Sequence, residues 1–407
     1  MAGVKQAAKM QLPSGLFLAP MVRGSELGFR MLARRSGNAS LCFSPMLRDH
    51  DVISVAANPS KFVKKELHID GAGRADSVEE TAYLLLHDVH PVDTANLVVQ
   101  LCGSRPSTLA QATTAILDIY SNGGTLPLGL DFNLGCPQEC ASKSGFGAFL
   151  VERNAHSAIE CVASMRSAID SYISETNILH SPMPMLSAKI RLLGCGVEDT
   201  IDFVKRLRSA GADYVTVHCR DRSDKHNGNP DWDSGGKIVD AMSSYNFPIV
   251  LNGGISNFND YQRVSGQTKC HAVMAATGYL RNHRGFEPTY SDVDVTTVAV
   301  EYLDFVDIYP PPSYLYIQKH LRWIFRDTLQ PKDEQSFDPG DYSDWRVKLW
   351  TFLVRPYLRT NEQYRMFVAL YVKLSGSRTH DEAPESIRHL IGDVTFGMVK
   401  KAGLLVR

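Results

Sequence analysis

The sequence predicts an α/β fold, a (β/α)8 barrel followed by a smaller all-helical C-terminal domain. Eight short apolar segments recur along the chain, stretches of helical periodicity separate them, and the alternation stops at the proline-rich segment 309–313. Continuous apolar runs are typical of parallel strands that helices cover on both faces. A doubly wound open sheet is the alternative. The count of eight and the lack of a G-x-G-x-x-G motif after the first strand favour the barrel.

The eight expected strands are rich in Val, Ile, Leu or Phe, and each is too short for a helix. They cover residues 16–21, 41–47, 97–103, 129–136, 185–192, 214–220, 248–254 and 272–278. Segments such as 157–169 and 197–211 between them have helical periodicity. The second of these has acidic residues in its first turn, basic residues in its last turn and Gly211 at its end, which are helix start and stop signals.

The chain after residue 312 has a different pattern, in which apolar and aromatic residues recur three to four apart with Lys and Arg between them. This periodicity predicts amphipathic helices. Three of the four Trp fall here, so the segment is expected to have its own core. We therefore expect an N-terminal tail (1–15), a catalytic barrel (16–308) and a helical domain (312–407). The helical domain has 15 basic and 11 acidic residues, whereas the rest of the chain has 28 basic and 33 acidic residues. The positive balance of the helical domain indicates a polyanionic partner.

The composition is that of a soluble globular protein, with 44% hydrophobic and 21% charged residues. No apolar run approaches the roughly 18 residues of a membrane span. The first residues lack the apolar core of a secretory signal, although Lys5 and Lys9 would suit a weak organellar presequence. The eight Cys form no C-x-x-C pair, so we expect reduced thiols, no metal site and a cytoplasmic location, with nucleus and mitochondrion as alternatives.

In a barrel, chemistry takes place at the carboxyl ends of the strands. The residues expected there, in strand order, are Pro20, Met21, Gln100, Asn133, Cys136, Lys189, Arg191, His218, Arg220, Asn252, Gly253, Gly254, Ala276 and Thr277. Lys189 lies in the middle of an apolar run, and a buried charge needs an anionic or strongly polar partner. A structural ion pair for Lys189 and a buried core position for His218 are the plainer interpretations.

Glycine-rich turns follow the seventh and eighth strands, where barrels often bind phosphate with backbone N–H groups. Amides of the turns at 253–254 and 276–277 would take the phosphate of a cofactor. Lys189 would then stabilise negative charge on a ring lying across the barrel mouth. A flavin needs this arrangement, because its reduced ring is anionic near N1.

Cys136 stands at the end of the fourth strand, directly before Pro137. A thiol with a pKa near 8.5 is mostly protonated at neutral pH and can give a proton to a carbanion. The alternative is a packed core thiol.

Together these motifs resemble the dihydrouridine synthase family over about residues 16–286. The segments "NLGCPQ" and "GFGAFL" are the most specific, and "AKIRL", "VTVHCR", the downstream pair Asp231-Trp232 and "PIVLNGGI" follow in the same order. The family comprises FMN-dependent barrel enzymes that reduce uridine in tRNA. "SPML" and "GAFL" resemble the eukaryotic branch that acts on D-loop positions sixteen and seventeen.

The resemblance implies a role for each candidate residue. Cys136 would donate a proton to C5 of uracil while FMN, reduced by NADPH, gives hydride to C6, after the uridine has been flipped out of the tRNA. The cofactor would be held by Pro20, Met21, Val22, Gln100, Lys189, His218, Asn252, Gly253, Gly254, Ala276 and Thr277. Asn133, Arg191 and Arg220 would contact the target nucleotide. Bacterial relatives have a Gly-Arg pair in place of Ala276-Thr277, so the resemblance implies either weaker FMN binding here or a phosphate held by backbone amides alone.

Basic side chains of the C-terminal helices would contact tRNA phosphates. They are Lys319, Arg322, Arg326, Arg346, Arg355, Arg359 and Arg365. For any one of them, a solvated helix face is the plainer interpretation. Two alternatives remain: an FMN-barrel oxidoreductase that acts on a free small molecule, and a catalytically decayed RNA-binding barrel. The basic helical segment argues against the first, and the presence of Cys136, Lys189 and His218 argues against the second. The sequence gives no indication of oligomeric state.

Overall fold

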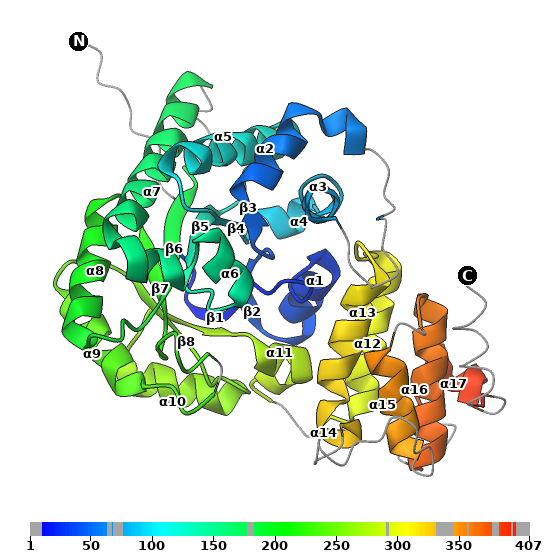
Figure 1. Ribbon diagram of the computed structural model, residues 1–407. Coiled ribbons are helices and arrows are strands. Elements are labelled where there is room, and N and C mark those ends of the chain that lie inside the picture. Colours follow the sequence, from blue (N-terminus) through cyan, green and yellow to red (C-terminus); the bar gives the residue numbers. More distant parts are fainter. Residues whose placement is uncertain are drawn as a thin grey trace. The chain divides into compact units, whose positions relative to one another are not determined.

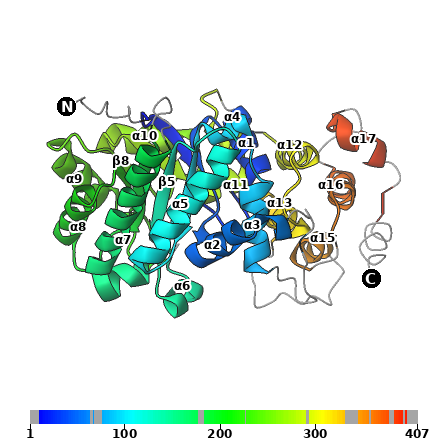
Figure 2. The same cartoon turned by 90° about the horizontal axis from the view of Figure 1, so that it is seen from above.

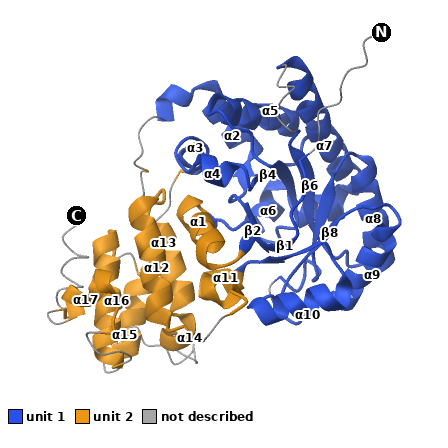
Figure 3. Ribbon diagram, turned by 180° about the vertical axis from the view of Figure 1, so that it is seen from behind, with its two compact units in different colours: residues 1–25, 39–65, 77–276 blue, residues 26–38, 66–76, 277–407 orange. Residues whose placement is uncertain are grey.

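The computed structural model describes most of the chain, namely residues 10–62, 67, 76–176, 183–225, 227–289, 293–330, 345–355, 358–376, 382–391 and 394–395. Contacts divide the chain into two compact units (Figure 3). The first takes residues from 1–25, 39–65 and 77–276 and holds the β-sheet. The second takes residues from 26–38, 66–76 and 277–407 and is helical in its described part.

Eight parallel strands of the first unit close into a barrel (Figure 1). They are β1 (Gly15–Leu18), β2 (Ala39–Phe43), β4 (Leu97–Cys102), β5 (Gly129–Leu134), β6 (Met185–Arg191), β7 (Tyr214–His218), β8 (Ile249–Asn252) and β9 (Ala272–Ala275). Each pairs with the next in this order, and β1 pairs with β9 to close the ring. The two-residue strand β3 (Leu47–Arg48) pairs only with β4. The predicted barrel and its eight strands are confirmed, and the open sheet is excluded.

Several strands end earlier than the apolar runs that predicted them. β5 stops at Leu134 rather than at residue 136, and β8 stops at Asn252 rather than at residue 254. Gly253 and Gly254 have φ angles of 119° and 69°, which lie outside the extended region of a strand. The last residues of those runs therefore form loops at the barrel mouth.

Helices of the first unit surround the strands (Figure 2). They are α2 (Asp49–Ala57), α3 (Ser77–Leu86), α4 (Pro91–Thr94), α5 (Pro106–Asn122), α6 (Glu139–Ser144), α7 (Ala148–Glu175), α8 (Val197–Ser209), α9 (Trp232–Ser243) and α10 (Phe258–Thr268), with the 3-10 helix η1 (Pro59–Phe62). The predicted segment 157–169 lies within α7, and 197–211 corresponds to α8. In α8, Glu198 and Asp199 occupy the first turn and Arg206 and Arg208 the last, as the sequence predicted.

The second unit consists of helices around an aromatic core. They are α1 (Leu27–Ser36), α11 (Thr277–Arg281), α12 (Val295–Ile308), α13 (Tyr314–Ile324), α14 (Arg326–Leu329), α15 (Trp345–Val354), α16 (Asn361–Ser375) and α17 (Glu385–Ile391), with the 3-10 helix η2 (His283–Phe286). Phe325 packs edge-on against Tyr371 at 4.8 Å between ring centroids. Buried Glu26 lies before α1 and accepts a hydrogen bond from Tyr302 of α12 at 3.2 Å. This contact ties an early segment of the chain to the C-terminal helices.

The division by contacts falls between Ala276 and Thr277, so α12 groups with the helices that follow it. The expected domain limits, 16–308 and 312–407, assign catalytic and RNA-binding roles to segments, and they stay a prediction. Most of the expected 1–15 tail lies outside the described residues. Among the residues that the structure describes, no helix has the length and apolarity to cross a membrane.

Gly129 of β5 lies directly against the backbone of Met185 in β6. A Cβ at this position would lie 2.6 Å from the backbone oxygen of Met185, and a backbone atom in a ladder cannot move aside. We expect Gly129→Ala to lower the free energy of unfolding by about 1–3 kcal/mol in chemical denaturation. Gly266→Ala in α10 is the matched control, because its Cβ would meet nothing within 4 Å. A Gly266→Ala loss as large as that of Gly129→Ala would contradict this account.

Candidate active site

Cys136 lies in the loop between β5 and α6, held by hydrogen bonds on both sides. The Oδ1 atom of Asn133 accepts hydrogen bonds from the N–H groups of Gly135 (3.2 Å) and Cys136 (3.0 Å). The backbone oxygen of Cys136 accepts a hydrogen bond from Ala148 at 3.2 Å. Gly147, with a φ of 65°, passes so close that a Cβ there would lie 2.8 Å from that oxygen. The loop is therefore fixed between the end of β5 and the start of α7.

The Cys136 side chain is half-buried, and burial raises the pKa of its thiol above the usual range. A hydrogen bond from the Gln138 backbone and the charges of Arg191 and Lys189 oppose this shift. The thiol is therefore protonated at neutral pH, as a proton donor must be. The role of Cys136 as proton donor stays a prediction.

Lys189 of β6 and Asn252 of β8 form a polar pair, with β7 between their strands. The Nζ atom of Lys189 donates to Oδ1 of Asn252 at 2.8 Å, and the Asn252 amide donates to the Met274 backbone oxygen at 2.8 Å. Burial lowers the pKa of Lys189 to about 8, with a smaller contribution from Arg191, while the Asp131 carboxylate acts against it. An ammonium has three N–H donors, so Lys189 can still donate to an anionic ligand.

A hydrogen-bonded network of buried polar side chains from β4, β5 and β6 lies in the barrel interior. Gln100 of β4 donates from Nε2 to Oδ2 of Asp131 (2.7 Å), and Ser187 of β6 donates from Oγ to Oδ1 of Asp131 (2.6 Å). The Nδ2 atom of Asn133 donates to Oε1 of Gln100 at 2.9 Å. Asp131 is fully buried, which raises its pKa to about 6. Sequence reasoning missed Asp131, although a charged residue inside the apolar run "GLDFNL" was a signal for it.

His218 and Arg220 lie together at the end of β7. Arg220 Nη1 is 3.1 Å from His218 Nε2. A guanidinium can only donate, so this contact assigns the acceptor role to Nε2 and the proton of a neutral imidazole to Nδ1. Arg220 also donates from Nε and Nη2 to the Gly228 backbone oxygen at 3.2 and 2.9 Å. A Cβ on Gly253 would lie 3.0 Å from the His218 ring, so only glycine leaves room there.

Arg191 connects two loops of the barrel mouth and is 4% exposed. It donates from Nε to the Gly135 backbone oxygen at 2.8 Å and from Nη1 to the Asp221 backbone oxygen at 2.9 Å. The register places Arg191 opposite His218, and His218 opposite Asn252. Arg191, Asn133 and Arg220 therefore all have hydrogen bonds to protein atoms, and their roles in nucleotide binding stay predictions.

The remaining candidate residues lie in the turns after β1, β8 and β9. Pro20 and Met21 are half-buried, and Val22 is 46% exposed. Gly253 accepts a hydrogen bond at its backbone oxygen from Trp232 Nε1 (3.2 Å). A Cβ on Gly254 would lie 2.7 Å from the Pro230 ring. Ala276 is half-buried, and Thr277 is the exposed first residue of α11, in the second unit.

The glycine turns and Lys189 suit an anionic cofactor such as FMN. A glycine at residue 253 leaves a space beside His218 that a Cβ would fill, and Lys189 has a cationic head at the same ends of the strands. The Lys189 ammonium can pair with the negative charge of a phosphate-bearing ring cofactor. The residues of the first unit therefore fit the group that the sequence predicted.

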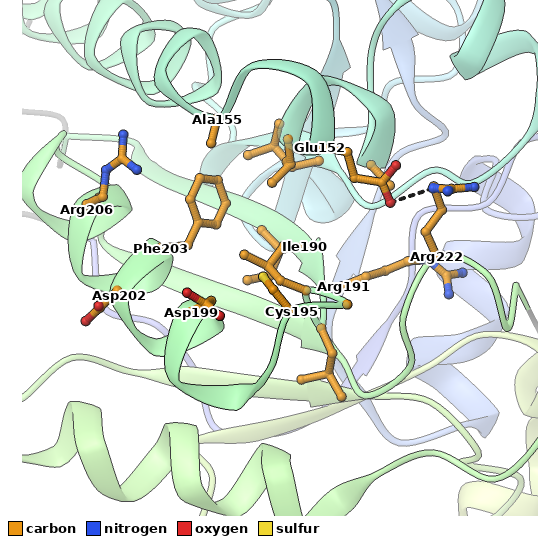
Figure 4. A pocket seen from close by; sticks show the side chains of 16 residues that line it. Glu152, Ala155, Ile190, Arg191, Cys195, Asp199, Asp202, Phe203, Arg206 and Arg222 are labelled. Carbon is orange, nitrogen blue, oxygen red and sulfur yellow. Dashed lines mark hydrogen bonds and ion pairs between the residues drawn. The ribbon is translucent and has the colours of Figure 1, made fainter.

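A separate cavity of about 650 Å3 lies between α7 and α8, beside the end of β6 (Figure 4). Ile190 and Phe203 line it, and so do Glu152 and Arg222, which form an ion pair at 2.6 Å. Arg191 contributes to its lining, but Cys136 and Lys189 do not.

In the part of the chain that the structure describes, no group of three His, Cys, Asp or Glu could hold a metal ion.

By its fold and site, the protein is a (β/α)8 barrel that gathers a protonated thiol, an amine and an imidazole at the ends of its strands. Such a site places a possible proton donor near a cationic side chain. The family model "Dihydrouridine synthase" matches residues 17–303, which is more than half of the chain. The chain belongs to the dihydrouridine synthase family, and the predicted resemblance is confirmed.

Three relatives illustrate the similarity. The mouse protein "tRNA-dihydrouridine(16/17) synthase (NAD(P)(+))-like" is 30% identical over 77% of this chain and 55% of its own length. The fission yeast (Schizosaccharomyces pombe) tRNA-dihydrouridine(16/17) synthase is 29% identical over 71% of this chain and 62% of its own. A human tRNA-dihydrouridine(20a/20b) synthase-like protein is 26% identical over 79% of this chain and 84% of its own length. The chain thus spans less than two thirds of the length of the 16/17 relatives it matches.

Proposed function

We propose that this protein is an FMN-dependent tRNA-dihydrouridine synthase that reduces a uridine of the tRNA D-loop, at position 16 or 17, with NADPH as reductant. The observation that carries the proposal is the protonated, half-buried thiol of Cys136, on the same barrel face as the free donors of Lys189. Family membership supports the reaction type. The names of the mouse and fission yeast relatives support the position.

FMN, when bound, supplies the hydride, and residues of the barrel mouth hold it in place. Lys189 would donate to the anionic edge of the ring, and Asn252 fixes the direction of the Lys189 side chain. Backbone amides of the turns at 253–254 and after β9 would bind the phosphate. Gln100, His218, Pro20, Met21 and Val22 would surround the ring, and a part for Thr277 stays a prediction.

The chain's own proton step belongs to Cys136. A uridine stacked in tRNA cannot reach the barrel mouth, so the nucleotide must leave the stack before reaction. The thiol proton of Cys136 then passes to C5 of the uracil ring, and the resulting thiolate must regain a proton from solvent. Asn133 and Arg191 keep the Cys136 loop in position through the backbone of residues 135 and 136.

Basic side chains of the second unit would contact tRNA phosphates, and two kinds of surroundings occur among them. Several lie over aromatic rings, including Arg326 over Trp323 at 4.8 Å and Arg359 over Tyr314 at 5.7 Å. Arg365 instead forms ion pairs with Asp304 and Asp307 and is 11% exposed at its side chain. The first kind can pair with phosphate or stack on a base, whereas Arg365 has its charge compensated within the protein.

The proposal is tested by an anaerobic half-reaction. The purified protein is reduced with NADPH and mixed with unmodified tRNA, and reoxidation of the flavin is followed by absorbance. We expect rapid reoxidation by tRNA but not by free uridine, and loss of product when uridines 16 and 17 are replaced by cytidine. A flavoprotein that ignores tRNA would favour a small-molecule reductase. A protein without bound flavin would favour a decayed RNA-binding barrel.

A further inference from the structure

A buried carboxylate, Asp131, lies in the barrel interior and has no part in the proton step. It is 0% exposed, and its two oxygens accept the hydrogen bonds from Gln100 and Ser187. Burial raises its pKa to about 6, so the carboxyl group is mostly ionised at pH 7 although burial disfavours its charge. An ionised carboxylate accepts hydrogen bonds and donates none.

This acceptor-only character sets the direction of every hydrogen bond that follows. Because Asp131 accepts from Nε2 of Gln100, the Gln100 oxygen must point to the other side, where Nδ2 of Asn133 donates to it. The Asn133 oxygen is then directed to the N–H groups of Gly135 and Cys136. The chain of amides thus runs in one direction from the carboxylate to the Cys136 loop.

We propose that Asp131 is a positioning residue, which fixes the orientation of the Gln100 and Asn133 amides and thereby holds the Cys136 loop in place for proton donation. A neutral amide at position 131 could donate as well as accept, so the Gln100 amide could adopt either orientation. In the reversed orientation, the Asn133 NH2 group would face the N–H groups of the loop, and two donors cannot bind each other. The loop would then be released for part of the time.

The inference deepens the proposed function and rests on it only for its effect on activity, because the order of the loop can be measured without tRNA. The probe is iodoacetamide, and the rate of alkylation of Cys136 is read by tandem mass spectrometry. Exposed Cys195 provides the internal reference. The protein is used as purified, and its thermal midpoint is recorded for each variant.

Three variants distinguish a reversal of the Gln100 and Asn133 hydrogen bonds from the simple loss of one hydrogen bond. Asp131→Asn removes the acceptor-only group, and we expect roughly tenfold faster alkylation of Cys136, the scale of losing one or two hydrogen bonds. Ser187→Ala removes a hydrogen bond from the same carboxylate, and because that hydrogen bond lowers the pKa of Asp131, all rates are compared at pH 8, where the carboxylate remains the acceptor and the rate should be that of the wild type. The double variant Asp131→Asn with Gln100→Glu places the acceptor-only group at position 100, where it can accept from both neighbouring amides. It should restore the wild-type rate.

A role limited to stability predicts a different result, in which alkylation follows the thermal midpoint. We expect the midpoint of Asp131→Asn to stay the same or rise, since a buried charge is removed, while alkylation accelerates. A wild-type rate in Asp131→Asn, or a double variant that reacts as fast as Asp131→Asn, would overturn the inference. If Asp131→Asn does not fold, the alkylation rates of the double variant and of Ser187→Ala test the inference, and faster alkylation than in the wild type in either of them would contradict it. A wild-type protein that ignores tRNA would refute the proposed function and leave the alkylation result unaffected.

Discussion

Replacing Cys136 by alanine is expected to slow the reduction of tRNA by about 10²- to 10⁴-fold, the range over which a positioned general acid contributes. In the proposed mechanism the thiol is the proton donor; the loop after β5 holds it in place, and its raised pKa keeps it protonated at neutral pH. Without it, the carbanion at C5 would have to take a proton from water. The measurement is single-turnover reoxidation of the reduced flavin by unmodified tRNA.

Reduction of the flavin by NADPH provides an internal comparison, because this half-reaction does not use the thiol and should keep its rate in Cys136→Ala. Cys140→Ala is the matched control, since this exposed cysteine lies four residues further along the same segment. It should behave as the wild type in both half-reactions. Equal rates of tRNA reduction in the wild type and in Cys136→Ala would remove the thiol from the mechanism.

The barrel could be predicted because buried parallel strands leave a local pattern in the sequence. Each of the eight apolar runs became a strand; the position of Cys136 at the end of one run and of Lys189 within another marked these two residues as candidates. Each strand could be recognised from its own apolar composition, without information about contacts to distant parts of the chain. The early ends of β5 and β8 follow from loop residues that apolar content alone does not distinguish.

Hydrogen-bond partners between strands could not be predicted in the same way. The link from Asp131 to Gln100 depends on the register of β5 against β4, which aligns Gln100 with Asp131. No local pattern in either strand states that register. Likewise, the grouping of α1 with the C-terminal helices depends on the contact between Glu26 and Tyr302, residues far apart in the chain. Tertiary packing decides such pairs.

Replacing Lys189 by methionine is expected to reduce the rate of flavin-dependent tRNA reduction by about 10²- to 10³-fold, the cost of losing a single preorganised donor to a developing negative charge. Methionine has a similar length and fills the same space, but it cannot donate. The same change should weaken flavin binding, which can be measured by fluorescence without any tRNA. Asn252 would lose its partner at 2.8 Å in this variant.

The pH dependence gives Lys189 a signature of its own. Burial lowers its pKa to about 8, so the ammonium is charged below pH 8 and loses its proton as the pH rises through that value. Flavin affinity in the wild type should therefore fall above about pH 8, while Cys136, whose pKa is raised, remains protonated at that pH. Lys189→Arg keeps a positive charge over the whole range, so its affinity should not fall near pH 8 even if it is lower overall. An alkaline decline at the same pH in Lys189→Arg would assign the titration to another group.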